Sequence, residues 1–142
     1  MYKTEAIITK VENFKENHLS ISVYSSQYGQ KSLVVFGGKS KKKNTTYVKG
    51  SFNNIEFDNN NVCLSSTSIN TFKWFLFSKY ELKAIDYFCF LINKLLFLAD
   101  QNSNVISYYL LLISKLNERS NYLPELLLLE LEILKASGYQ PN

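Results

Sequence analysis

The residues with the clearest chemical potential are lysines gathered in one short segment behind a Gly37-Gly38 pair. Four of them occupy five consecutive positions: Lys39, Lys41, Lys42 and Lys43. Lys49 follows, and so many ammonium groups cannot all find acidic partners nearby. Clustered lysines raise the local positive potential and release counterions when they bind phosphate. The segment therefore predicts an anionic partner such as nucleic acid, with a solvated, mobile loop as the alternative.

Aromatic residues are interleaved with these lysines: Tyr24, Tyr28, Phe36, Tyr47, Phe52 and Phe57. Small barrels bind single strands with a basic groove and with aromatic faces that stack on bases, at about 1–3 kcal/mol per base. Most of the rings must be core, because alternate positions of a barrel strand point inward. We expect only one or two of the three tyrosines to reach a surface groove. Tyr28 and Tyr47 are the aromatic candidates, and Lys31 is a further basic candidate.

The sequence offers few residues for catalysis. His18 is the only histidine and is expected on the surface in a turn. The motifs of phosphate-binding loops, dinucleotide folds, zinc proteases and serine hydrolases are absent. Cys63 and Cys89 stand 26 positions apart, without the spacing of a zinc site, and are expected to be buried thiols. We predict a non-enzymatic protein with no cofactor, metal or small-molecule substrate; an enzyme with scattered, unrecognised residues is the alternative.

The composition changes near residue 69, which predicts two domains, 1–68 and 69–142. The whole formal charge of +4 falls in the first part, with nine lysines against five acidic residues. That part also alternates apolar and polar residues in five short runs separated by turn residues, as strands do. The last long run, residues 47–58, contains Gly50, where we expect a bulge or bend. Five short strands suit a small closed or nearly closed barrel.

The second part has the three- and four-residue spacing of helices over residues 81–98, 105–116 and 124–136. A short helix around residues 72–77, anchored by Trp74, is expected to link it to the barrel. Leu126 to Leu129 are apolar all round, so the last helix is either central in a bundle or a face for a partner. The two parts should pack together, because no Pro- or Gly-rich linker separates them.

The chain shows no signal for secretion or membrane insertion. Residues 1–10 lack the charged and apolar regions of a signal peptide. Charged residues interrupt the apolar second half before it reaches the roughly 18 residues of a spanning helix. We therefore expect a cytoplasmic protein without a membrane partner.

Four segments, in order along the chain, resemble the RecO family of bacterial recombination mediators. They are Met1-Tyr2-Lys3-Thr4-Glu5-Ala6-Ile7-Ile8, Tyr28-Gly29-Gln30-Lys31-Ser32, Gly37-Gly38-Lys39-Ser40-Lys41-Lys42-Lys43, and Leu131-Glu132-Ile133-Leu134-Lys135-Ala136-Ser137-Gly138-Tyr139-Gln140-Pro141-Asn142. The resemblance implies an N-terminal five-stranded OB-fold barrel followed by an all-α helical domain. It also implies a DNA repair factor that binds single- and double-stranded DNA and anneals strands. Such proteins act with RecR and help load RecA onto strands coated by single-stranded DNA-binding protein.

The chain departs from this family at its end. Members commonly continue after the Gly-Tyr-x-Pro-Asn stretch into a four-cysteine zinc module, and this sequence stops at Asn142. Zinc is therefore not expected, and the helical site for the tail of single-stranded DNA-binding protein is in doubt. Two alternatives to a DNA-binding mediator remain: a protein-docking module that acts through the apolar helical half, and a truncated relic with a fold but no activity.

Overall fold

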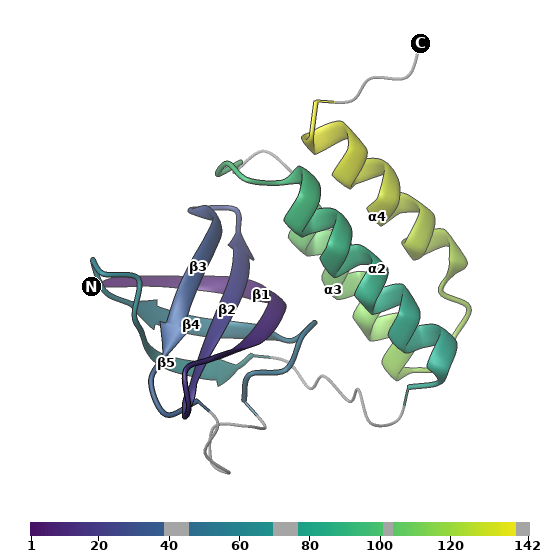
Figure 1. The fold of residues 1–142 in the computed structure, drawn as a ribbon. Coiled ribbons are helices and arrows are strands. Elements are labelled where there is room, and N and C mark those ends of the chain that lie inside the picture. Colours follow the sequence, from purple (N-terminus) through teal and green to yellow (C-terminus); the bar gives the residue numbers. More distant parts are fainter. Residues whose placement is uncertain (39–45, 70–76, 101–103, 139–142) are drawn as a thin grey trace.

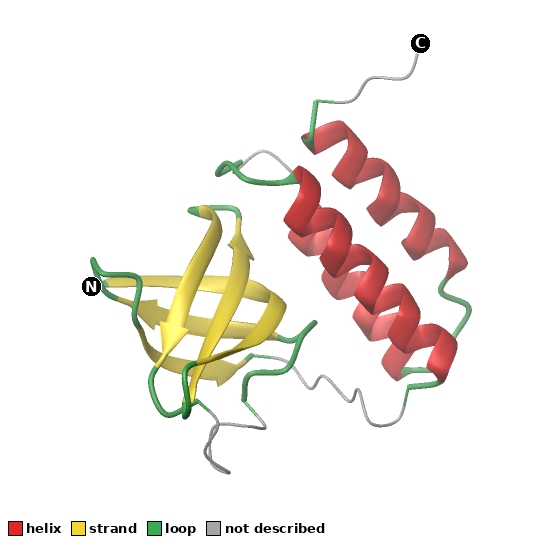
Figure 2. Cartoon of the chain, viewed as in Figure 1, coloured by secondary structure: helices red, strands yellow, loops and turns green. Residues whose placement is uncertain are grey.

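The computed structural model describes residues 1–38, 46–69, 77–100 and 104–138, which form an antiparallel sheet followed by helices (Figures 1 and 2). The strands are β1 (Tyr2–Phe14), β2 (His18–Ser25), β3 (Gly29–Val35), β4 (Phe52–Phe57) and β5 (Cys63–Ser68). Their order in the sheet is β3-β2-β1-β4-β5. The predicted fold class is confirmed, because five antiparallel strands curl into a barrel and helices follow them.

The long strand β1 holds the sheet together, because its two halves pair with different neighbours. Tyr2 to Ile7 pair with β4, and Ile7 to Phe14 pair with β2. The register with β2 shifts between Ile8 and Lys10, an irregularity of the kind that bends a strand and increases its twist. The bend curls the sheet, so that β3 approaches the start of β5.

The sheet is not fully closed. Between β3 and β5 the pairing is a single parallel bridge from Val34 to Val62, supported by the Val34 N–H, which donates to the carbonyl of Asn61 at 2.9 Å. The curled sheet still encloses a core of its own. The buried residues of that core are Ala6, Ile8, Leu19, Ile21, Val23, Leu33, Val35, Tyr47, Ile55, Phe57 and Cys63.

The fourth strand is shorter than its sequence pattern suggests. Residues 47–58 were expected to be strand, but only Phe52–Phe57 pairs as one. Residues 46–51 make a turn, in which the Ser51 N–H donates to the carbonyl of Val48 at 3.1 Å. Gly50 lies in this turn with a positive φ of 97°, so it marks the approach to the strand rather than a bulge inside it.

Three helices follow, close to the predicted ranges: α2 (Lys79–Leu95), α3 (Val105–Asn117) and α4 (Leu123–Ala136). A capping box starts α2, because the Ser78 hydroxyl accepts from the Glu81 N–H and the Glu81 carboxylate accepts from the Ser78 N–H. Gly138, at φ 90°, follows the end of α4 as expected. The predicted helix with Trp74 lies outside the described residues, apart from Phe77. No helix in the described ranges is long and apolar enough to cross a membrane.

The helical domain packs directly on the barrel, as expected. Ile7, Tyr24 and Phe52 from the strands share a buried cluster with residues of all three helices. Polar contacts cross the same junction: the Tyr109 hydroxyl donates to the carbonyl of Gly50 at 2.6 Å, and the Gln30 N–H donates to the carbonyl of Phe97 at 3.0 Å. The barrel and the helices therefore form one packed unit (Figure 1).

The last helix is not central in this arrangement. Only Leu129 and Ile133 of α4 are buried. Four of its leucines are 47–61% exposed: Leu123, Leu127, Leu128 and Leu131. The prediction of a central helix is wrong, because α4 packs chiefly on α3 and leaves its other side uncovered; the alternative, an uncovered apolar face, is what the structure has.

Candidate nucleic-acid interface

The sequence-predicted residues do not all come together. Lys39, Lys41, Lys42 and Lys43 lie outside the described residues. Of the remaining four, Tyr28 and Lys31 line one pocket, Tyr47 is buried inside the barrel, and Lys49 lies at the junction with α2. The pocket around Tyr28 and Lys31 is therefore where the described structure gathers predicted binding residues.

This aromatic pocket lies where the start of β1 meets the end of β4 and the turn that follows it. It encloses about 420 Å³ and is lined by Tyr2, Tyr28, Lys31, Phe57, Asp58, Asn59 and Asn61. Strand pairing explains how the rings meet, because Tyr2 and Phe57 are direct partners in the β1–β4 register. Tyr28 reaches them from the β2–β3 turn, where its N–H donates to the Ser25 hydroxyl at 3.0 Å.

The three rings form a compact cluster in which Tyr2 is exposed, Tyr28 is partly exposed and Phe57 is buried. Tyr2 stacks on Phe57 with centroids 5.2 Å apart and an interplanar angle of 24°. Tyr28 meets both rings edge-on, at 5.8 Å from Tyr2 and 5.5 Å from Phe57. Phe57 is 3% exposed, whereas Tyr2 is 40% exposed. The buried ring thus supports a tyrosine whose open face is available to a flat ligand.

Polar groups complete the other side of the aromatic pocket. The Asp58 carboxylate accepts from the N–H groups of Asn60 and Val62, both at 2.9 Å, and these bonds fix the β4–β5 turn. Asn59 and Asn61 line the pocket beside Lys31, and amide side chains both donate and accept hydrogen bonds. The pocket therefore offers an aromatic face, an ammonium group and amides, a combination that suits a nucleobase with its phosphate.

Tyr47 does not act as predicted. It is 7% exposed, and its hydroxyl lies 3.7 Å from Cys63 Sγ in the barrel core. Burial raises the pKa of the Tyr47 hydroxyl well above its ordinary value. Its ring has no free face for a base, because the chain turns before β4 and directs Tyr47 inward. Of the three tyrosines considered, Tyr24 is buried too, at 1%, and Tyr28 is the one that is partly exposed.

Lys49 is placed elsewhere. Its ammonium pairs with the Asp86 carboxylate of α2 at 2.6 Å, with side chains 44% and 56% exposed. The structure therefore does not bring Lys49 into the aromatic pocket. It remains accessible at the barrel–helix junction.

His18 is not a free surface side chain. Its Nδ1 accepts from the Gly37 N–H at 2.9 Å, and its ring meets Phe36 edge-on at 5.0 Å. It is the first residue of β2 and anchors the end of the neighbouring strand, so the expectation of a solvated turn residue is wrong. The two cysteines are buried thiols as expected, and burial raises the pKa of the Cys89 thiol to about 12.

Sequence reasoning did not single out Tyr2, Asn59 or Asn61, and it named Phe57 only among the interleaved aromatic residues. Tyr2 and Phe57 are 55 positions apart, and only the β1–β4 register makes them neighbours. The one available signal was the Asn59-Asn60-Asn61 run, which indicated a turn but not what it faces. Among the described residues, no three histidine, cysteine or acidic side chains gather to hold a metal ion.

Comparison with known protein families gives one match, and it covers the strands that form the aromatic pocket. Residues 1–62 match the family model described as "Recombination protein O N terminal". The match spans β1 to β4 and the turn that lines the aromatic pocket. No curated protein sequence matches the chain.

Proposed function

We propose that the chain, whose residues 1–62 match the RecO N-terminal family model, acts in recombination and repair by binding single-stranded DNA without bond chemistry. The observation that supports the proposal most is the aromatic pocket. It places the exposed Tyr2 ring, Tyr28 and Lys31 around one open volume on the domain that matches the family. Aromatic faces beside ammonium groups are the elements that hold single strands on small barrels.

The proposed mechanism is charge neutralisation and strand alignment. Lys31, with the lysines of residues 39–43, neutralises backbone phosphates, and the rings of the aromatic pocket stack on a base. Lysine acts as a point charge rather than a two-pronged donor, so these contacts carry little sequence information. A strand held in this way keeps its base edges free for a complementary strand. The proposal extends to strand annealing and recombinase loading, to double-stranded DNA as a further ligand, and to RecR and single-stranded DNA-binding protein as partners.

The test is fluorescence anisotropy of a labelled 30-mer single strand at two salt concentrations. Replacing Lys41, Lys42 and Lys43 by Ala should weaken binding. It should also flatten the salt dependence by up to about 2 units of slope, because each phosphate contact on a single strand contributes about 0.7. The matched control replaces three exposed helix lysines, Lys79, Lys83 and Lys135, and removes the same charge. Equal slopes for the two variants, or no binding by the native chain, would reject the proposal.

A second candidate function rests on the uncovered side of α4. Leu127, Leu128 and Leu131 expose about half of their surface, more apolar area than a solvated helix needs. In this alternative the helical half docks a protein partner or a second copy, and DNA contact is residual. Size-exclusion chromatography with light scattering distinguishes the two. A strict monomer without affinity for RecR or single-stranded DNA-binding protein rules out docking, and a chain inactive in every assay indicates a relic.

A further inference from the structure

A second cleft, separate from the aromatic pocket, lies where the barrel meets α2. It encloses about 290 Å³ and is lined by Thr9, Lys10, Lys49, Asp86, Cys89, Phe90, Asn93 and Lys94. We call it the junction cleft. Its residues come from β1, from the turn before β4 and from one side of α2, so neither domain forms it alone.

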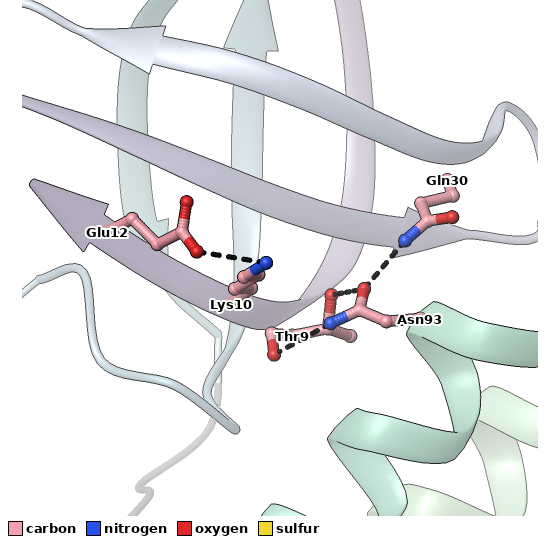
Figure 3. A network of polar contacts seen from close by, with 5 residues as sticks. All are labelled: Thr9, Lys10, Glu12, Gln30 and Asn93. Atoms are coloured by element: carbon pink, nitrogen blue, oxygen red, sulfur yellow. Dashed lines mark hydrogen bonds and ion pairs between the residues drawn. The ribbon is translucent and has the colours of Figure 1, made fainter. Parts of the chain in front are cut away.

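The floor of the junction cleft is held rigid by hydrogen bonds between the two domains (Figure 3). The Thr9 hydroxyl and the Gln30 amide both donate to Asn93 Oδ1, at 2.6 and 2.7 Å. Asn93 Nδ2 donates in return to the carbonyl of Thr9 at 3.2 Å. These bonds fix α2 against β1 at the register irregularity, so the groups above them keep a constant spacing.

The rim of the junction cleft is basic. Three of its lining residues are lysines, and Asp86 is the one acidic residue among them. Lys49 pairs with Asp86 at 2.6 Å, and Lys10 pairs with Glu12 at 2.9 Å (Figure 3). The four side chains are 44–57% exposed. Ion pairs between such exposed groups contribute little, so an incoming phosphate can take the place of either carboxylate at small cost.

One aromatic ring stands beside these ammonium groups. Phe90 is 56% exposed, although it projects from the side of α2 that borders the barrel. Lys94, one helical turn further on, holds its Nζ 5.9 Å from the centre of that ring. A free inorganic anion would use the lysines and leave the ring uncovered. A nucleotide uses both, because its phosphate meets the lysines while its base covers the ring.

We propose that the junction cleft binds one nucleotide of a single strand, with the phosphate among Lys10, Lys49 and Lys94 and the base stacked on Phe90. The inference rests on the proposed function, since it extends the bound strand from the barrel onto α2. Because both domains contribute, the strand also fastens the helical domain to the barrel.

The experiment compares two double variants of α2 that each remove one lysine and one exposed aromatic ring. Phe90→Ala with Lys94→Ala changes the junction cleft. Lys79→Ala with Tyr80→Ala is the matched control, because Tyr80 is 77% exposed at the far end of the same helix. In anisotropy titrations of the 30-mer, the cleft variant should bind about tenfold more weakly than the control. Its salt slope should fall by about 0.7, as expected for one lost phosphate contact.

A further variant, Phe90→Trp, reports on the stacked base directly. The strand should quench its added fluorescence, and inorganic phosphate should not. If the cleft variant and the control variant bind the 30-mer with equal affinity, the proposal that the junction cleft binds a nucleotide is wrong, while DNA binding by the barrel is unaffected. A native chain that binds no strand at low salt would overturn the proposed function and the cleft together. Quenching by inorganic phosphate alone would show an anion site without a base.

Discussion

Two faces of one barrel carry tyrosines of the same hairpin, and the helices cover only one of these faces. Tyr24 is 1% exposed and lies in the cluster shared with the helices. Tyr28, four positions later, borders the open aromatic pocket. Tyr24 lies in β2 and Tyr28 in the β2–β3 turn, and the sequence alone does not show which of them a helix covers. What separates them is the position of α2 and α3, so the covered face serves stability and the open face is free for a ligand.

Removing a ring from the covered face should have the largest effect. Tyr24→Ala leaves a cavity between barrel and helices, and truncation of a buried aromatic ring costs about 3–5 kcal/mol. Total stabilities of domains are about 5–15 kcal/mol, so the loss is a large fraction. Urea unfolding followed by circular dichroism measures it. Tyr28→Ala, the same change on the open face, should cost clearly less, and equal losses would contradict the distinction between the faces.

For DNA binding, the substitution on the open face should have a large effect. Tyr28→Ala removes a ring that supports Tyr2 at 5.8 Å, and loss of one stacking contact weakens single-strand binding by about 1–3 kcal/mol. Anisotropy with the labelled 30-mer measures the change. Tyr28→Phe, which keeps the ring, should bind like the native chain. An unchanged affinity for Tyr28→Ala would remove the aromatic pocket from the proposed interface.

The inward faces of the strands could be predicted from the sequence, but the burial of their outward residues could not. The alternation Leu19, Ile21, Val23 predicted a strand with one inward face, and all three side chains are buried in the barrel core. The outward side of the same strand gave no signal, because burial of Tyr24 depends on helices that begin 55 or more positions later in the chain. The aromatic pocket was predictable only in part, since Tyr28 and Lys31 are close in sequence and Tyr2 and Phe57 meet through strand register.

A polar contact of the covered face should have a moderate effect. Tyr109→Phe deletes the hydroxyl that donates to the carbonyl of Gly50 at 2.6 Å and leaves that buried acceptor unpaired. Such a loss costs about 1–3 kcal/mol. Urea unfolding should show it, with Tyr108→Phe on the neighbouring, partly buried position as the control. If both variants have native stability, the hydroxyl does not hold barrel and helix together.

Alkaline pH should lower the free energy of unfolding, because buried groups of the covered face resist deprotonation. Burial raises the pKa of the Cys89 thiol from 9.0 to about 12, so above pH 9 the unfolded chain loses a proton that the folded chain keeps. The contribution of Cys89 to stability is therefore full well below pH 9 and falls as the pH rises toward 12, by about 1.6 kcal/mol between pH 9 and 10.5. Burial raises the pKa of Tyr109 in the same direction. The difference between the urea midpoints at the two pH values should shrink in Cys89→Ala, with the remainder due to Tyr109, and an unchanged difference would assign the effect to other groups.

The smallest expected effect on stability comes from the ion pair at the edge of the covered face. Lys49 and Asp86 are both about half exposed, so replacing either should change the free energy of unfolding by less than about 1 kcal/mol. Their effects on DNA should have opposite signs: Lys49→Ala removes a phosphate contact and weakens binding, whereas Asp86→Asn removes a competing carboxylate and strengthens it. Anisotropy and urea unfolding of both variants separate these effects. If Asp86→Asn binds no better than the native chain, the pair is a structural contact and the bound strand stays on the barrel.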